Sequence, residues 1–154
     1  CSMPVCDNLD CIVAFTDIGT KMICLHACSK NITGEGMADL LFNMVVRRFG
    51  IPSRIVSDND VRFVSNAWKA LMHRLDLKHN TTSPFTPNSN GRAEFTNRMT
   101  LQVLHALKAR GSNNWVRDLP IVEMILNSTP KTCSISVLTV VVRCLSLSCC
   151  VRLA

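Results

Sequence analysis

Two acidic residues occupy positions at which metal-dependent chemistry could be built. Asp58 directly follows the short apolar run Ile55–Val56, and Glu94 opens a helical pattern, with thirty-five residues between the two. A carboxylate at a strand end and another in the first turn of a helix can share a divalent cation if the fold brings them together. Mg²⁺ prefers oxygen ligands and is usually held by one or two carboxylates together with substrate phosphates. The pair therefore predicts metal-assisted phosphoryl transfer.

A purely structural interpretation of the two acids stays open. Asp58 could be a turn residue, and Glu94 could be a helix-start acid that interacts favourably with the helix dipole. Residues 83–91, rich in Pro, Asn and Ser, predict a loop that leads into Glu94. A mobile loop would let this carboxylate close on a bound substrate, whereas a plain solvated connection is the alternative.

The remaining pattern predicts strands and helices that would position the acids. Residues 11–17 and 21–27 are β-rich runs that predict a hairpin, residues 54–57 predict a strand, and residues 77–82 predict a short edge strand. One helix is expected from an N-cap at Thr33 to a stop at Gly50, and a second from an N-cap at Ser65. Pro120 is expected to kink or split the last helical stretch.

The helix that begins at residues 92–94 predicts two different faces. Its polar residues recur at spacings of four, four and three, and its apolar residues recur on another side. The polar set is Glu94, Arg98, Gln102 and His105, and the apolar set is Phe95, Met99, Val103 and Ala106. The polar set could bind a polyanion or simply face solvent.

Four blocks of sequence follow one another in the chain: IVSDNDVRF, NAWKALMHRL, SPFTPNSNGRAEFTNRM and NNWVRDLPIVEMILNST. In this order they resemble the catalytic core of retroviral and gypsy-type retrotransposon integrases, and the resemblance runs from about Met3 to Thr129. It implies an α/β fold, a mixed ribonuclease H-like sheet flanked by helices and missing its first strand. It also implies an N-terminally truncated core over residues 1–129, followed by a divergent apolar tail over residues 130–154.

By this resemblance, Asp58 and Glu94 are the second and third members of an Asp, Asp, Glu triad that binds Mg²⁺ or Mn²⁺. The implied activity is DNA integration by a retrotransposon polyprotein, through metal-dependent 3′-end processing and strand transfer. Arg92, Asn97 and Arg98 are the implied DNA contacts; phosphate contacts of this kind position nucleic acid without reading its sequence. The implied partners are element ends, target DNA and further copies of the chain, with no membrane, inside the cell and in the nucleus for integration.

The first acid of that triad has no good match in the sequence. Aligning MPVCDNLDCIVAFTD with the family's pattern places it just before Cys1, on a strand that would lie at the centre of the sheet. Asp7, Asp10 and Asp17 are the stand-ins, and none is well placed to share a metal with Asp58. Two hypotheses therefore stay open, an integrase-type enzyme and a catalytically inactive nucleic-acid-binding remnant, with a ribonuclease H as a weaker third.

Composition supports a basic globular domain. The 154 residues are 47% hydrophobic and 18% charged, and the net charge of +6 favours a polyanionic partner. Nine cysteines lack zinc-type spacing and predict reduced thiols, while Cys24, His26 and Cys28 alternate on one strand and predict a packed face. The tail has high β-propensity, and Arg143 interrupts its apolar run, which argues against a transmembrane span.

Overall fold

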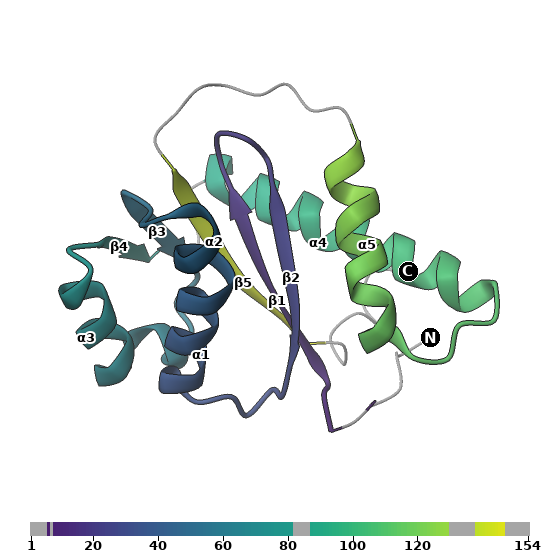
Figure 1. Cartoon of the computed structure of the whole chain (residues 1–154), viewed down its shortest axis with the longest axis horizontal. Helices are drawn as coiled ribbons and strands as arrows, with labels where there is room; N and C mark the ends of the chain where they lie inside the picture. Colours follow the sequence, from purple (N-terminus) through teal and green to yellow (C-terminus); the bar gives the residue numbers. More distant parts are fainter. Residues whose placement is uncertain (1–5, 7, 82–86, 130–137, 147–154) are drawn as a thin grey trace.

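The structure of the chain is a computed structural model that describes residues 6, 8–81, 87–129 and 138–146. For residues 87–93, 145 and 146 it describes the backbone alone. A single mixed sheet runs through the centre and helices surround it (Figure 1). This arrangement confirms the predicted α/β class.

Five strands form the sheet in the order β2-β1-β5-β3-β4. β1 runs antiparallel to both β2 and β5, whereas β3 runs parallel to both β5 and β4. All seven residues of β1 are buried, as expected for an apolar strand covered on both faces. The strand bounds are β1 Cys11–Asp17, β2 Ile23–Cys28, β3 Arg54–Ser57, β4 Lys78–Thr81 and β5 Thr139–Ser146.

The central strand of the sheet comes from the apolar tail. β5 lies between β1 and β3, and Val142 is opposite Phe15 on one side and Ser57 on the other. Its β-branched residues favour a strand because they pack well on a pleated surface. Sequence analysis predicted a missing central strand and a divergent tail, but not that residues 139–146 would fill the centre. Residues 130–137 and 147–154 of the tail lie outside the described residues.

The helices begin and end largely where the sequence predicted. The Oγ of Thr33 accepts a hydrogen bond from the Gly36 backbone N–H at 3.1 Å, and Gly50 ends the first helical stretch with a φ of 87°. The Oγ of Ser65 accepts from the Trp68 N–H at 3.2 Å. The helices are α1 Gly34–Leu41, a π-helical segment Phe42–Val46, α2 Arg47–Phe49, a 3₁₀ turn Val61–Val64, α3 Asn66–Arg74, α4 Pro87–Ala109 and α5 Trp115–Ser128.

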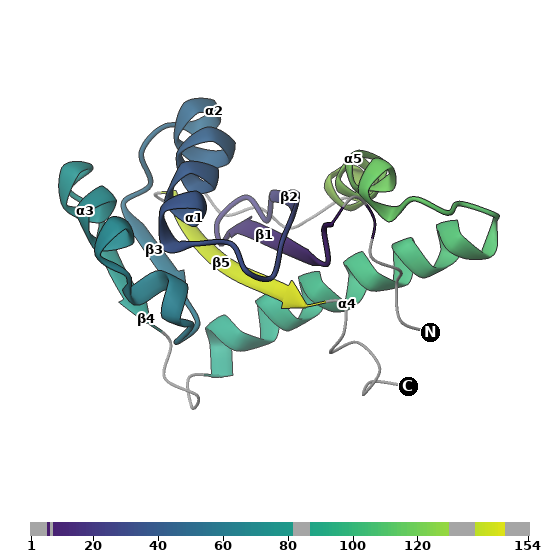
Figure 2. The ribbon, with the colours of Figure 1, turned by 90° about the horizontal axis from the view of Figure 1, so that it is seen from below.

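Helices cover both faces of the sheet and one of its edges (Figure 2). α1 and α3 cover one face, with a core that includes Phe15, Trp68 and Val142. α4 crosses the other face, over a second core that includes Ile12 and Leu104. α5 lies along the β2 edge, where Asn127 Oδ1 and Glu123 Oε2 accept hydrogen bonds from β2 backbone N–H groups at 2.9 and 2.7 Å. This contact satisfies part of an edge that would otherwise be open.

Two details of α4 differ from the sequence prediction. The helix begins at Pro87, inside the predicted loop 83–91, because proline's fixed φ and missing N–H suit the first helical position. Residues 83–86 of that loop lie outside the described residues. The apolar set packs only in part: Met99 and Val103 contact the core, while Phe95 is 54% exposed, and the buried residues of the helix include Thr96, Thr100 and Leu104. Burial of Thr100 is tolerated because its hydroxyl donates to the Thr96 carbonyl at 2.8 Å.

Pro120 does not divide α5. The helix runs as one element from Trp115 to Ser128 with Pro120 inside it. Trp115, Leu119, Val122 and Leu126 are buried on its inner side, so tertiary packing offsets the hydrogen bond that proline cannot make.

Candidate active site

Asp58 lies directly after β3, as the sequence predicted. β3 pairs Ser57 with Val142 of β5, so continuing this parallel register by one residue sets Asp58 beside Arg143. Side chains alternate between the two faces of a sheet. Because Ile55 and Val142 belong to the core under α1 and α3, Asp58 and Arg143 are directed to the face that α4 crosses.

The environment of the Asp58 carboxylate is poor in partners. Burial raises its pKa, because removal from water disfavours the charged form, and the Arg143 guanidinium opposes this rise. The buried Oδ1 has no hydrogen-bond partner within the described ranges. A buried carboxylate oxygen of this kind needs an explanation, and a nearby cation provides one. The site therefore fits positive charge, whether from Arg143 or from a metal ion.

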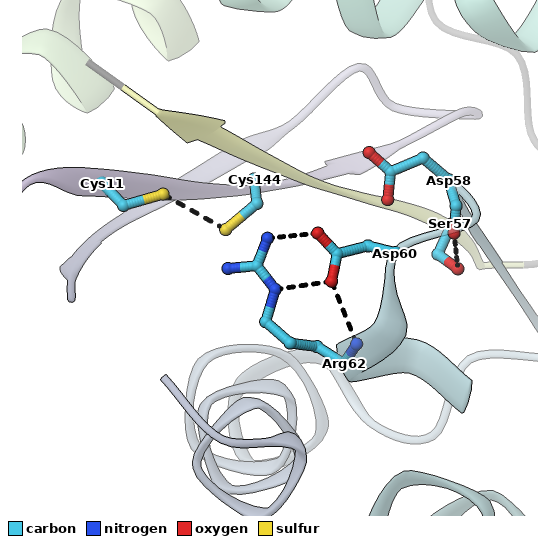
Figure 3. Close-up of polar contacts among 6 residues, drawn as sticks. All are labelled: Cys11, Ser57, Asp58, Asp60, Arg62 and Cys144. Carbon is cyan, nitrogen blue, oxygen red and sulfur yellow. Dashed lines mark hydrogen bonds and ion pairs between the residues drawn. The ribbon is translucent and has the colours of Figure 1, made fainter. Parts of the chain in front are cut away.

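Asp60, two residues further on, is ion-paired with Arg62 (Figure 3). Its Oδ1 accepts from the Arg62 backbone N–H at 3.0 Å and from Nε at 2.7 Å, and its Oδ2 is ion-paired with Nη2. These hydrogen bonds from Arg62 lower the pKa of Asp60. Both of its oxygens are occupied, so Asp60 does not replace the acid that the sequence lacks. Sequence analysis missed this pair, although the two-residue spacing was visible.

Ser57 holds the turn that carries Asp58. Its buried Oγ donates to the Asp58 carbonyl at 3.0 Å and lies 2.9 Å from Nε2 of His79 on β4. Burial lowers the pKa of His79, so its imidazole is neutral near pH 7. The end of β3 is thereby tied to its neighbouring strand, which fixes the backbone from which the Asp58 carboxylate projects.

α4 presents the other predicted site residues. Glu94 and Arg98 are exposed on it, and the Arg98 guanidinium lies 5.9 Å from the centre of the Phe95 ring. Asn97 is half-buried, and its Oδ1 is a second buried oxygen for which the described residues offer no partner. Arg92 is in the helix, where its backbone alone is described. The predicted polar face is confirmed as exposed at Glu94, Arg98, Gln102 and His105.

The fold sets Asp58 and α4 on the same side of the sheet without joining the two predicted acids directly. No hydrogen bond connects Asp58 with Glu94, both of which are among the described residues. Carboxylates that share a metal are held together by the ion, so the lack of a direct bond is compatible with a shared ligand role. Arg143 beside Asp58 is the residue that sequence analysis did not find. Only the β-propensity of the tail pointed to a strand there, and it could not give the strand's partners.

Comparison with known proteins identifies the fold. No family model matches the chain. The Tf2-3, Tf2-4 and Tf2-5 transposon polyproteins of Schizosaccharomyces pombe are each 28% identical to it over 127 residues, which is 82% of this chain and 10% of each polyprotein. The chain therefore spans about one tenth of the length of these relatives.

Two solved structures share the arrangement of strands and helices. A chain of the simian T-cell lymphotropic virus intasome in complex with PP2A regulatory subunit B56 gamma matches with a TM-score of 0.69 and 20% identity, over 82% of this chain and 45% of that one. The catalytic core domain of BIV integrase matches with a TM-score of 0.67 and 18% identity, over 78% of this chain and 76% of that one. At these identities the likeness establishes the fold.

Proposed function

We propose that this chain, which has the ribonuclease H-like fold of an integrase catalytic core, is the core fragment of a retrotransposon integrase. Its homologues are retrotransposon polyproteins. The observation that carries the proposal is the buried Oδ1 of Asp58, which has no hydrogen-bond partner among the described residues. Asp58 follows β3 on the face of the sheet that α4 crosses, and α4 is the helix that presents Glu94. The reaction class is polynucleotidyl transfer, with 3′-end processing followed by joining to target DNA.

Asp58 and Glu94 are the residues that would hold Mg²⁺ or Mn²⁺. Such ions lower the pKa of a bound water and stabilise the attacking and leaving oxygens of a phosphoryl transfer. Asp58 supplies a carboxylate fixed by the Ser57 turn, while Glu94 supplies one from an exposed helix position. Asn97 and Arg98, on the same helix, would position the DNA backbone near these carboxylates, and Arg92 is proposed to join them.

A second candidate function is supported by Arg143. Its positive charge acts on Asp58 from β5, the central strand that lies beside β3. A guanidinium there repels a divalent cation and partly neutralises Asp58. This arrangement favours a catalytically inactive nucleic-acid-binding remnant.

Metal binding to an Arg143→Asp variant tests the site. Exchanging a cation for an anion beside a divalent ion changes the Coulomb energy by about 2–3 kcal/mol even at the dielectric constant of water. We therefore expect Mn²⁺ to bind about 30- to 100-fold more tightly at low ionic strength, measured by the electron paramagnetic resonance of free Mn²⁺.

Two further variants control this measurement. Arg48→Asp makes the same charge change at an exposed position of α2, on the opposite face of the sheet, and is expected to leave Mn²⁺ affinity nearly unchanged. Arg143→Ala removes only the repulsion and is expected to give a smaller gain. An affinity that is the same in all three variants would place divalent binding away from Asp58.

DNA binding through α4 is tested by Arg98→Ala. Each DNA phosphate that a protein neutralises releases counterions and contributes about 0.9 to the magnitude of the slope of log affinity against log salt concentration. We expect Arg98→Ala to lower the slope for duplex DNA by about 0.9, with similar losses for unrelated sequences, as measured by fluorescence anisotropy. Arg48→Ala on α2 is the matched control. A slope that falls equally for both variants would indicate non-specific attraction to a basic protein rather than contact by α4.

A further inference from the structure

Three cysteines from three neighbouring strands meet on the α1 and α3 face of the sheet. Cys11 of β1 is directly opposite Cys28 of β2 in the antiparallel register. Cys144 of β5 approaches from the other side, with its Sγ 3.3 Å from the Sγ of Cys11 (Figure 3). All three sulfur atoms lie within 4.8 Å of one another. Strand pairing brings them together from positions 133 residues apart, which explains why sequence spacing gave no sign of a site.

The sulfur geometry fits a tetrahedral thiolate site. A Zn–S bond is about 2.3 Å long, so two sulfurs on one tetrahedral Zn²⁺ lie about 3.8 Å apart. The separations in the cluster, from 3.3 Å to at most 4.8 Å, bracket this value. Small rotations of the cysteine side chains would suffice to reach it, with no shift of the strands. The fourth position of the shell would be left for a water or another exogenous ligand, as in sites with three protein ligands.

A disulfide fits the Cys11 and Cys144 positions less well. Cys11 is opposite Ser146 and Cys144 is opposite Val13, so the two cysteines are diagonal rather than direct neighbours. Diagonal Cα atoms of antiparallel strands are about 7–8 Å apart, beyond the usual range of about 4.4–6.8 Å for a disulfide. Cys11, Cys28 and Cys144 are free thiols. Their positions therefore suit binding of one common metal ion better than a disulfide between Cys11 and Cys144.

Hydrogen bonds within the cluster affect its three thiols unequally. Hydrogen bonding from Cys144 and Cys28 lowers the pKa of Cys11 well below its usual range, and the nearby Arg62 guanidinium contributes to this fall. Hydrogen bonding with Cys11 raises the pKa of Cys144, and hydrogen bonding with Cys11 and Cys144 raises the pKa of Cys28, so a bound cation has to displace the protons of these two thiols. The Nη1 of Arg62 is buried and has no hydrogen-bond partner among the described residues, while its other nitrogens contact Asp60. Three thiolates and one Zn²⁺ carry a net charge of −1, and the Arg62 guanidinium beside them attracts this charge, although Asp60 already balances its own.

We propose that Cys11, Cys28 and Cys144 form a binding site for a thiophilic d¹⁰ cation, Zn²⁺ above all, that fastens β5 to β1 and β2. Cys11 and Cys28 are 1% and 4% exposed, whereas Cys144 is half-buried and provides the path of entry. Soft thiolate ligands select Zn²⁺ or Cu⁺ over Mg²⁺. The site is separate from the proposed oxygen-ligand site, which is on the other face of the sheet, and it does not depend on the proposed function.

Zn²⁺ binding to the reduced full chain tests the proposal. We expect one Zn²⁺ per chain in competition with a chromophoric chelator, retained in excess Mg²⁺, and a rise of about 5–10 °C in the midpoint of thermal unfolding. Co²⁺ in its place is expected to show thiolate-to-metal charge-transfer absorption. Cys144→Ser, at the half-buried position, is expected to weaken Zn²⁺ binding by at least about 100-fold.

Cys24→Ser is the matched control. Cys24 is on β2, like Cys28, and it is 5% exposed, but it is not part of the cluster. This variant is expected to keep the Zn²⁺ stoichiometry of one. Equal binding by the Cys144→Ser and unsubstituted chains would overturn the proposal. So would a Cys11–Cys28 disulfide, found by mass spectrometry, that persists when Zn²⁺ is supplied under mild reduction.

Discussion

Replacing Val142 by proline is expected to unfold the chain. Val142 is fully buried in β5 and has a strand on each side, so its N–H points towards one neighbour or the other. Proline removes that donor and adds a ring that the pleat cannot accommodate, which is why it is confined to edge strands and bulges. The carbonyl left without its donor costs about 1–3 kcal/mol, and the clash of the ring and the lost packing add to this, so little remains of a typical stability of about 5–15 kcal/mol.

Urea unfolding followed by circular dichroism measures this effect, with Val142→Ala as its control. Alanine keeps the N–H and loses two methyl groups, so we expect it to cost about 2 kcal/mol while the transition stays cooperative. The difference between the two variants isolates the contribution of the strand backbone. If Val142→Pro unfolds at the same urea concentration as the unsubstituted chain, β5 does not hold the centre of the sheet in solution.

Replacing Glu94 by glutamine is expected to remove metal-dependent cleavage and joining of DNA. Glutamine has the size and helix propensity of glutamate, but its amide is neutral and binds a hard divalent cation poorly. Because metal ions supply several kcal/mol of transition-state stabilisation, the rate should fall by at least about 100-fold. The measurement is Mn²⁺-dependent nicking and joining of labelled oligonucleotides, for the chain and for its Arg143→Asp variant.

Asp39→Asn is the matched control for the loss of one negative charge. Asp39 is exposed on α1, on the opposite face of the sheet from α4, and its replacement is expected to leave the rate unchanged. Activity that survives Glu94→Gln would have to arise from another site. Chains that bind DNA but show no metal-dependent nicking, with or without Arg143→Asp, would support the inactive remnant.

Local signals in the sequence predicted much of this structure. The caps at Thr33 and Ser65, the stop at Gly50 and the strand before Asp58 depend on neighbouring residues, and all are confirmed. The likeness of four sequence blocks to integrases also predicted the fold that the structural comparison shows.

Non-local effects account for what the sequence analysis missed. The partners of β5 are set by pairing with residues more than eighty positions away, and no local pattern encodes this pairing. The burial of Thr100 on α4 was not predicted, because Thr100 satisfies its own hydroxyl through the Thr96 carbonyl and so behaves as a core residue. The roles of Asp58 and Glu94 as metal ligands stay predictions, which the variants above test.

The central position of β5 also has a consequence for how the chain folds. The β1–β2 hairpin and the β3–β4 pair can each form from nearby segments, but each would leave an edge of unpaired backbone groups until β5, the latest of the five strands in the chain, arrives between them. Closing so long a loop before its contacts form is entropically costly and slows folding. Two open half-sheets can also accept β5 from a second chain, so strand exchange between copies competes with correct folding at high concentration.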